Sequence, residues 1–430
     1  MAAVKQTHLG ISFKGWVLRG FMLIGLLYCL VPAGTKGSSF GDVLRGCISV
    51  AIVLVTAALY RPRISRSNAW RLTCFFVFSL FAAFHTTSGY SLIFGCAVVF
   101  GVILATAASQ NSGFRKHLAS TILALLLASV LGLIIQLAVY IYNGTVLDVH
   151  ALVYPHSESR VFEGIGLVRL TSFYTEPGTY ANWVYLLLLI YTVLSPKVKR
   201  YLIFTVAASM IVALSAWGTV VALLLFGVTI FGNVGRGALR PSLAVALIAS
   251  LVIVGLFVPL DAVLETLASK TTMDDASVDS KIVTYTEFYR TFGQFLIFGD
   301  GFSSRFCEFC LSPQDAGFAL SLSVVMGVLF TVWVLCSYFI ALLREGELRL
   351  AVLSLPLMFT KAFYWDFAVW MLFFLVVTRR FSTGQRSYFR RQASSSTLPL
   401  IKDTVSTIGA TAPRRCGSSR NYYGVGVVDE

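Results

Sequence analysis

The sequence predicts an all-α polytopic membrane protein, and three observations support this fold class. Hydrophobic residues make up 57% of the 430-residue chain and charged residues only 13%, against about 25% charged residues in soluble domains. The mean hydropathy is +0.79. Apolar runs recur along the chain at roughly the 20-residue length that a membrane-spanning helix needs. An ordinary soluble protein is therefore excluded.

Twelve such runs can be drawn, each bounded by polar or charged turns. They cover residues 15–33, 43–60, 72–86, 90–108, 118–142, 178–194, 201–215, 217–232, 241–260, 315–342, 348–362 and 364–378. The division between the seventh and eighth runs is the weakest, because only Ser215–Gly218 separates them. The sequence thus predicts about twelve transmembrane helices within a transmembrane domain, 1–378. A disordered basic cytoplasmic tail is predicted over 379–430, which is rich in Ser, Thr and Arg.

The positive charges test this division, because cytoplasmic connections of membrane proteins carry an excess of Lys and Arg. The cations fall in alternate connections, at Arg61–Arg71, Arg115–Lys116, Lys197–Arg200, Arg236–Arg240 and Arg344–Arg349. This topology puts 25 of the 34 Lys and Arg inside and 15 of the 20 Asp and Glu outside. Both termini are therefore predicted to be cytoplasmic, with two large external loops at about 143–177 and 261–314. The net charge of +14 needs no nucleic-acid partner, since the membrane explains it.

The first five predicted helices are interpreted as scaffold. Arg19 and Arg45 fall near helix ends, where a long basic side chain can extend to the interface, so a structural role is expected for both. The later helices are nearly free of charge apart from Lys361 and Asp366 near an outer end. Candidate functional charges are therefore expected in the two external loops.

The first external loop ends in a polar, aromatic stretch, Arg169–Trp183, that runs directly into an apolar helix. Pro177 suits the first position of a helix, and the preceding Glu176 is then the N-cap residue. The carboxylate is expected at the mouth of a membrane helix, near the water boundary. Two interpretations stay open at this point: a helix cap that anchors the interface, or a functional carboxylate.

The second external loop alternates aromatic and polar residues over Tyr285–Phe302. The apolar positions between Phe288 and Leu296 suit an amphipathic helix that lies on the membrane surface. Arg290 would then lie at the level of the lipid phosphates. Two interpretations of Arg290 stay open at this point: a lipid anchor or a functional cation.

Cys307 and Cys310 form the only CxxC pair in the external loops. One such pair supplies two of the four ligands that a structural zinc needs. In an oxidising compartment, a local disulfide is favoured over a metal site or a thiol redox centre. Free thiols remain a further alternative.

The motifs of the two loops resemble the O-antigen polymerase and ligase superfamily. In chain order they are Arg169–Pro177, Leu214–Gly218, Arg290, Phe298-Gly-Asp-Gly301, Asp315-Ala-Gly and Met326-Gly327. The resemblance covers about residues 165–335, and within the superfamily the chain is most similar to Wzy-type polymerases.

The chain departs from the pattern of the superfamily in two places. Members often carry Ser-Arg-Gly where this chain has Ala216-Trp217-Gly218, so any anion-binding role there is lost or has moved. The ligase branch has a histidine in its large periplasmic loop, whereas 261–314 contains none, and this favours a polymerase.

The resemblance implies an enzyme of the bacterial inner membrane, in lipopolysaccharide biosynthesis. It would join oligosaccharide repeat units carried on undecaprenyl diphosphate into O-antigen or a related polysaccharide at the periplasmic face. Its partners would be this lipid-linked oligosaccharide, membrane lipids, a chain-length regulator and a flippase. The alternatives are an O-antigen ligase or another lipid-linked glycan transferase, and a polysaccharide flippase or secondary transporter.

The residues of the loops offer a metal-independent glycosyl transfer. Transfer from a lipid diphosphate to a sugar hydroxyl needs positive charge on the departing diphosphate and a base for the hydroxyl. No clustered Asp-x-Asp or His/Cys set is present to hold a metal, so neither a metal nor another cofactor is expected. Guanidinium groups suit the diphosphate because of their bidentate geometry. The expected catalytic residues are Arg169, Glu176, Arg290 and, as a less favoured base, Asp315; the expected substrate contacts are Arg160, Arg305, Tyr174, Trp183 and Tyr285.

Overall fold

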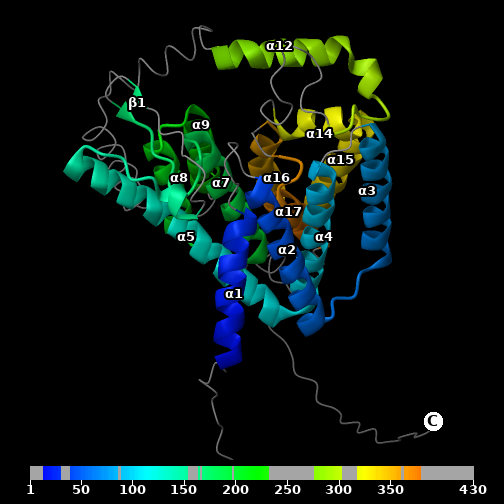
Figure 1. Ribbon diagram of the computed structural model, residues 1–430, viewed down its shortest axis with the longest axis horizontal. Helices are drawn as coiled ribbons and strands as arrows, with labels where there is room; N and C mark the ends of the chain where they lie inside the picture. Colours follow the sequence, from blue (N-terminus) through cyan, green and yellow to red (C-terminus); the bar gives the residue numbers. More distant parts are fainter. Residues whose placement is uncertain are drawn as a thin grey trace, which may run out of the picture. The chain divides into compact units, whose positions relative to one another are not determined.

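The computed structural model describes residues 13–30, 39–85, 89–153, 163–164, 167–195, 198–231, 276–302, 317–359 and 363–378, and this part of the chain is mostly helical (Figure 1). Its helices are α1 (Phe13–Leu30), α2 (Ser39–Tyr60), α3 (Arg66–His85), α4 (Gly89–Gln110), α5 (Ser112–Asn143), α6 (Val149–Val153), α7 (Pro177–Leu194), α8 (Arg200–Val212), α9 (Ala216–Phe231), α12 (Ala276–Arg290), α14 (Phe318–Met326), α15 (Val328–Arg344), α16 (Leu348–Ser354) and α17 (Phe367–Thr378). Two 3-10 helices are η1 (Phe292–Phe295) and η2 (Leu355–Phe359), and the short strands β1 (Glu163–Gly164) and β2 (Leu167–Val168) pair antiparallel.

The chain divides into Met1–Arg380 and Phe381–Glu430, and every described residue lies in the first unit. The predicted helix over 241–260 and the predicted tail over 379–430 lie outside the described residues.

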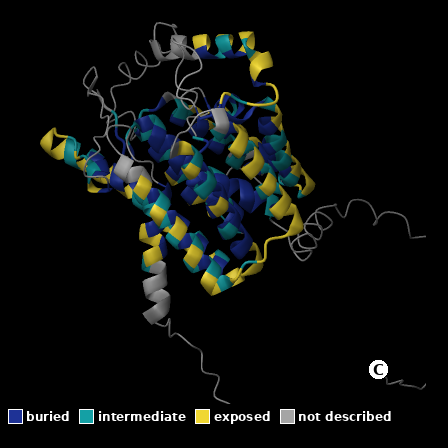
Figure 2. Ribbon diagram, turned by 45° about the vertical axis from the view of Figure 1, so that its right-hand side comes forward, coloured by how far each residue is buried: buried dark blue, intermediate teal, exposed yellow. Residues whose placement is uncertain are grey.

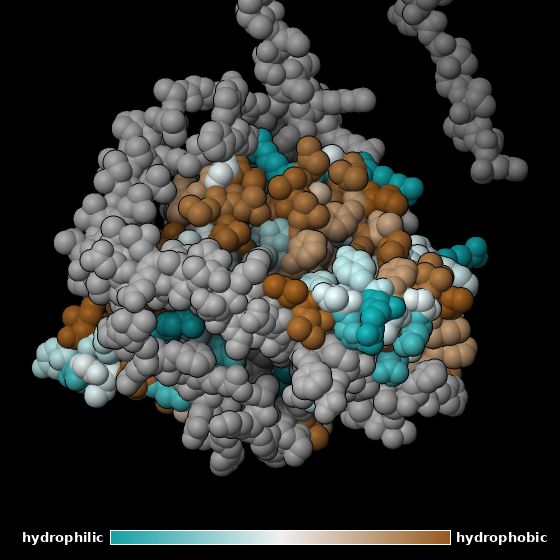
Figure 3. Space-filling view, turned by 90° about the horizontal axis from the view of Figure 1, so that it is seen from above, coloured by the Kyte–Doolittle hydropathy of each residue, from teal (hydrophilic) through white to brown (hydrophobic). Residues whose placement is uncertain are grey.

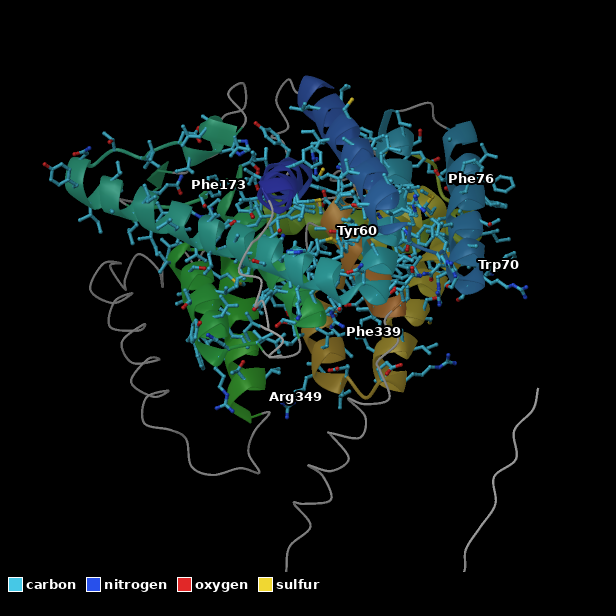
Figure 4. The ribbon with its side chains drawn as sticks, turned by 90° about the horizontal axis from the view of Figure 1, so that it is seen from below. Tyr60, Trp70, Phe76, Phe173, Phe339 and Arg349 are labelled. Carbon is cyan, nitrogen blue, oxygen red and sulfur yellow. The ribbon has the colours of Figure 1, made fainter. Side chains whose placement is uncertain are left out.

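Four of the described helices are long and apolar enough to cross a membrane. They contain the stretches Val43–Tyr60, Tyr90–Gln110, Ser112–Asn143 and Pro177–Leu194. Large aromatic side chains also stay exposed: Trp70 and Phe76 of α3 are 66% and 70% exposed and point away from the other helices (Figure 4). Exposed apolar surface of this kind marks a face that meets another apolar phase. The apolar, helical character predicted from the composition is confirmed.

Helices α4, α7 and α17 form the buried centre of the described fold (Figure 2). Every residue of α7 from Tyr180 to Ile190 is buried, so other parts of the protein surround this apolar helix on every side. Helix α4 approaches α17 so closely that a Cβ atom added to Gly101 would lie 2.7 Å from the Trp370 carbonyl oxygen. Phe75 of α3 contacts the Trp370 ring edge-on, with ring centroids 4.9 Å apart. Helix α7 thus packs against α17, whose Trp370 belongs to an aromatic core.

Three basic connections of the described chain lie at one end of the helices. The turn between α2 and α3 is joined to the end of α4, since Arg63 N–H donates to Gln110 Oε1 at 2.9 Å and Gln110 Nε2 donates to Arg63 O at 2.6 Å. At the start of α5, Arg115 donates to the Val193 and Leu194 carbonyls at the end of α7, at 3.0 and 2.8 Å. Connections that follow α2, α4 and α7 therefore share an end, as an alternating path of helices requires.

The span predicted over 315–342 is not one helix. Its described part forms α14 and α15, separated by Gly327 at φ 98°, a left-handed conformation that favours glycine. The segment Leu296–Gly301 packs into this break: Leu329 N–H donates to Leu296 O at 3.0 Å, and Asp300 N–H donates to Val324 O at 2.6 Å. An uninterrupted apolar run predicts one continuous helix. The run itself does not reveal the contact with the distant segment Leu296–Gly301.

The same contact explains the Gly-x-Gly motif and gives a first testable prediction. A Cβ atom at Gly299 would overlap the backbone of Val324 and Val325, and overpacking of this kind costs about 1–3 kcal/mol or more. Gly299→Ala should therefore lower the free energy of unfolding in detergent, followed by tryptophan fluorescence, by at least that amount. Gly293→Ala is the matched control, because nothing lies within 4 Å of the added carbon. Equal stability of the two variants would contradict the packing role.

A buried ion pair corrects the expectation for Arg45. This residue was expected at the interface, yet it is 2% exposed, and its Nη2 lies 3.7 Å from Asp366 Oδ1. The same nitrogen donates to Cys29 O at 3.2 Å, and the guanidinium lies 5.8 Å from the ring centroid of Phe367. Asp366 Oδ2 accepts a hydrogen bond from Phe363 N–H at 2.9 Å. Arg45 does not extend to the interface because a carboxylate that precedes α17 holds it inside.

Candidate active site

The loop from Arg169 to Glu176 is held in place by α5. Gln136 Oε1 accepts hydrogen bonds from the backbone N–H groups of Thr171, at 3.0 Å, and Ser172, at 2.6 Å. Ser172 has a left-handed φ of 54°, and its Oγ donates to Ser129 O at 2.6 Å. All four of these residues are buried. A strained loop conformation persists only where the surroundings determine it, and here α5 supplies the partners.

The aromatic half of the loop is anchored from two sides. The buried Tyr174 hydroxyl lies 3.1 Å from Ser129 Oγ, and its ring meets Tyr180 edge-on at 5.7 Å between centroids. On the other side, His150 Nδ1 of α6 lies 2.6 Å from Phe173 O. A carbonyl oxygen can only accept, so Nδ1 carries the proton and donates. Burial is the largest influence on His150 and lowers its pKa, which favours the neutral ring in this role.

The loop ends where the sequence predicted, at the start of α7. Pro177 is the first helical residue, and Glu176 occupies the N-cap position with an extended backbone, φ −142° and ψ 151°. The Glu176 side chain forms no cap hydrogen bond with the first turn. The carboxylate is therefore not committed to the helix amides that an N-cap side chain usually satisfies. The N-cap position is confirmed, and the side chain does not serve as the cap.

The start of α9 packs beside this entrance. Ser215 Oγ accepts a hydrogen bond from Gly218 N–H at 3.2 Å, which caps the helix. A Cβ atom at Gly218 would lie 2.9 Å from Ala181 Cβ, and one at Gly178 would lie 3.8 Å from Ser215 Oγ. Both motifs of the first half of the resemblance, the loop before α7 and Leu214–Gly218, therefore lie against the first turns of α7.

Arg169 and Glu176 stand at the two ends of the anchored loop. Both are partly exposed, whereas Leu170, Thr171 and Ser172 between them are buried. A guanidinium presents paired donors to a phosphate, and a carboxylate can accept a proton from a hydroxyl. A fixed loop that carries one of each can support displacement of a phosphate leaving group.

Two of the residues expected to stack on a sugar are inside the protein. Tyr174 is 0% exposed and Trp183 is 2% exposed. Stacking needs an open ring face, so in this conformation the two rings support the loop and α7 and do not meet a ligand. Burial also raises the pKa of Tyr174, which keeps its hydroxyl protonated next to Ser129.

Arg290 is placed apart from this loop. It is the last residue of α12, its side chain is 77% exposed, and its Nη2 pairs with Glu287 Oε1 at 3.0 Å. Within the described residues these contacts stay on α12, so the structure does not bring Arg290 to Arg169 or Glu176. Tyr285 on the same helix is half-buried, and burial raises its pKa.

The apolar side of the α12–η1 segment packs on protein. Phe288 and Phe295 stack with ring centroids 5.5 Å apart and form a small cluster with Leu320 and Val324 of α14. Seen from this end of the molecule, the described surface carries a broad hydrophobic area with hydrophilic side chains beside it (Figure 3). The apolar positions predicted for one amphipathic helix on the membrane surface are instead divided between the end of α12 and η1, and Phe288 and Phe295 pack on α14 beside the α14–α15 break.

The remaining expected residues lie outside the described part of the chain. They are Arg160, Arg305 and Asp315 of the expected site and the cysteine pair Cys307 and Cys310. The substrate-binding, base and disulfide roles expected of them stay predictions.

The residues that position the loop were not singled out in the sequence. Ser129, Gly132 and Gln136 lie at spacings of three and four, which places them on one face of α5. A Cβ atom at Gly132 would lie 2.5 Å from Ser172 Oγ, so the glycine makes room for the loop. A lone amide in a long apolar helix needs a buried partner. The spacing of these small and polar residues is the sequence signal that indicates the face of α5 on which the loop packs.

Gln136→Leu should loosen the loop, because it removes the acceptor of two buried backbone N–H groups. An unsatisfied buried donor costs about 1–3 kcal/mol, so the free energy of unfolding should fall by a few kcal/mol. Hydrogen exchange at Thr171 and Ser172 should speed up in the same variant. Gln294→Leu, on an exposed glutamine of η1, is the control and should leave both measurements unchanged. Unaltered exchange in Gln136→Leu would show that α5 does not fix the loop.

In comparisons with known proteins, no family model, no curated protein and no solved structure matches this chain. Among the described residues, no group of three or more His, Cys, Asp and Glu side chains is arranged to hold a metal ion.

Proposed function

We propose that the chain is a Wzy-type polymerase that joins undecaprenyl-diphosphate-linked oligosaccharide repeat units. The observation that carries the proposal is the loop Arg169–Glu176, which α5 fixes at the entrance of the buried helix α7. The polar residues at its ends are the two types that transfer from a diphosphate needs. The order of motifs along the sequence supports the same family.

In the proposed reaction, a hydroxyl of one lipid-linked glycan attacks the carbon that joins the other glycan to its diphosphate. The new glycosidic C–O bond forms as the bond to the diphosphate oxygen breaks. Glu176 accepts the hydroxyl proton, and Arg169 pairs with the negative charge that develops on the departing lipid diphosphate. Arg290 and the expected residues outside the described chain would contact the phosphate or the sugars.

The proposal includes twelve membrane spans, cytoplasmic termini and periplasmic loops over about 143–177 and 261–314. The gathering of basic connections at one end of the described helices supports it. Reporter fusions at Glu158 and Asp275 should give periplasmic activity, and fusions at Arg63, Lys199 and Arg386 should give cytoplasmic activity. A reversed result at either large loop would remove the site from the periplasmic face.

Lipopolysaccharide from a strain that lacks the gene tests the activity. A single repeat unit on the lipid core is the expected result, because ligation continues when polymerisation stops. Bare core would indicate a ligase or a flippase, and an unchanged ladder of chain lengths would reject all three.

A flippase or secondary transporter is the second candidate, and the buried Arg45–Asp366 pair favours it, since ionisable residues such as Arg45 inside membrane helices often mark transport paths. An activity assay with purified protein distinguishes the polymerase from the transporter. A polymerase lengthens a lipid-linked repeat unit in detergent, where no compartments exist, whereas a transporter has no activity under those conditions.

A further inference from the structure

A polar cavity of about 380 Å³ lies at the end of the helices that carries the basic connections, far from the candidate active site. Its lining comes from the α2–α3 turn, the start of α3 and the ends of α4 and α17. The cavity adjoins the start of α5, whereas the loop Arg169–Glu176 is anchored at Ser129–Gln136. At 1.5 Å per residue this separates the two by roughly 25–35 Å along α5. The cavity is a different site.

The charge of the lining is positive and is not balanced within it. Arg63 and Arg71 line the cavity, and no Asp or Glu does. Arg71 is half-buried and donates through Nη1 to Asn68 Oδ1 at 2.9 Å. No ion pair joins either arginine to a carboxylate within the described residues. A partly buried guanidinium without a counter-charge is costly, so an external anion would stabilise this arrangement.

The start of α3 adds to the positive electrostatic potential of the cavity. Ser65 Oγ accepts from Asn68 N–H at 3.3 Å and so caps the helix, and Ser65, Ser67 and Asn68 all line the cavity. The N-terminal turn of α3 therefore forms part of the cavity wall, and the positive end of a helix dipole favours anions.

An independent observation points to a ligand. Thr106 of α4 lines the cavity and is 2% exposed, and its Oγ1 has no hydrogen-bond partner in the described part of the chain. Buried hydroxyl groups are normally satisfied. An oxygen-rich anion in the cavity supplies the acceptor that Thr106 lacks, together with acceptors for the guanidinium groups.

We propose that this cavity binds a phosphate group, as the headgroup of an anionic phospholipid or as a free phosphate ion. Its volume is at the small end of the range of about 300–1,000 Å³ for ligand pockets, which suits a headgroup without its acyl chains. Its location at the basic end of apolar helices gives a lipid headgroup direct access. The bound phosphate neutralises Arg63 and Arg71 and ties α3, α4 and α17 together at this end.

Native mass spectrometry of the full-length protein in detergent tests the proposal. The probes are phosphatidylglycerol, phosphatidylcholine with the same acyl chains, and inorganic phosphate. The wild type should retain one phosphatidylglycerol in preference to phosphatidylcholine. Arg71→Gln should weaken that binding about tenfold, the value of one charge-assisted hydrogen bond. Thr106→Val, which leaves the charge unchanged, should weaken it about threefold.

Arg66→Gln is the matched control. It removes the same charge from the same helix, but Arg66 is exposed and does not line the cavity. Binding should change by less than about twofold, because exposed charges are screened. An equal loss in Arg66→Gln and Arg71→Gln would reduce the effect to general surface charge and overturn the site. Binding of phosphatidylglycerol at the wild-type level in both Arg71→Gln and Thr106→Val would also overturn the site.

The inorganic phosphate arm separates the two sources. Displacement of phosphatidylglycerol by phosphate, with both lost in Arg71→Gln, supports a phosphate site that takes either source. Retention of phosphate without any preference for phosphatidylglycerol assigns the cavity to a soluble phosphate group. If neither probe binds better than phosphatidylcholine, the proposal fails.

Discussion

Glu176→Gln should lower the rate of glycan transfer by about 100-fold or more, the usual scale for loss of a general base. Glutamine keeps the size of the side chain but cannot accept the proton of the attacking hydroxyl. Helix stability should hardly change, since Glu176 makes no side-chain cap hydrogen bond and the cap contributes at most about 1 kcal/mol. The measurement is turnover of a purified lipid-linked repeat unit in detergent, with a chelator present and no added divalent metal.

Glu347→Gln provides the matched control. Glu347 is also an N-cap residue without a side-chain cap hydrogen bond, at the start of α16, so the same chemical change is made at a comparable helix position. Its turnover should equal that of the wild type. Full turnover by Glu176→Gln would remove Glu176 from the mechanism, and loss of wild-type turnover in chelator would remove the metal-free scheme.

The start of α7 could be predicted from the sequence because its signals are local. Pro177 fixes a backbone angle that suits a first helical position, and Glu176 before it takes the N-cap conformation. The long apolar helices follow equally directly from composition. In each case neighbouring residues decide the structure, so no knowledge of distant contacts is needed.

The break at Gly327 and the support of the active-site loop depend on segments far apart in the chain. Gly327 lies in an apolar run that predicts one continuous helix. The break at Gly327 is stabilised by hydrogen bonds with the distant segment Leu296–Gly301. Gln136 reads as an isolated polar residue until Thr171 and Ser172 are placed beside it. The sequence contained the polar and small residues that mark these contacts, but the identity of each partner is a property of the packed fold.

Arg45 shows the same limit for charge. Its position near a helix end predicted an interfacial side chain, and its partner Asp366 lies more than three hundred residues later in the sequence. A buried guanidinium is tolerated only when a carboxylate and further acceptors surround it. Here Asp366 and the Cys29 carbonyl do so. The pair joins α2 to the beginning of α17, the helix at the centre of the fold.

Removal of one member of the Arg45–Asp366 pair should destabilise the protein by about 3–5 kcal/mol, because the other charge is left buried. Asp366→Asn is the better single change, since the amide oxygen can still accept from Phe363 N–H. Arg45→Met is the reciprocal change and keeps an apolar stem of similar length. The measurement is the free energy of unfolding in mixed micelles of increasing denaturing detergent, with equal insertion checked first.

The double variant Arg45→Met/Asp366→Asn should recover most of the stability lost in the singles, since no uncompensated charge remains. The exposed pair Arg290–Glu287, at 3.0 Å, is the control. Arg290→Met and Glu287→Gln should each cost less than about 1 kcal/mol, because water screens a surface pair. Additive losses in the Arg45 and Asp366 variants would show that the two charges are not coupled. In a well-folded double variant, preserved polymerisation would assign the pair to structure, whereas loss of polymerisation at full stability would assign it a role in the reaction.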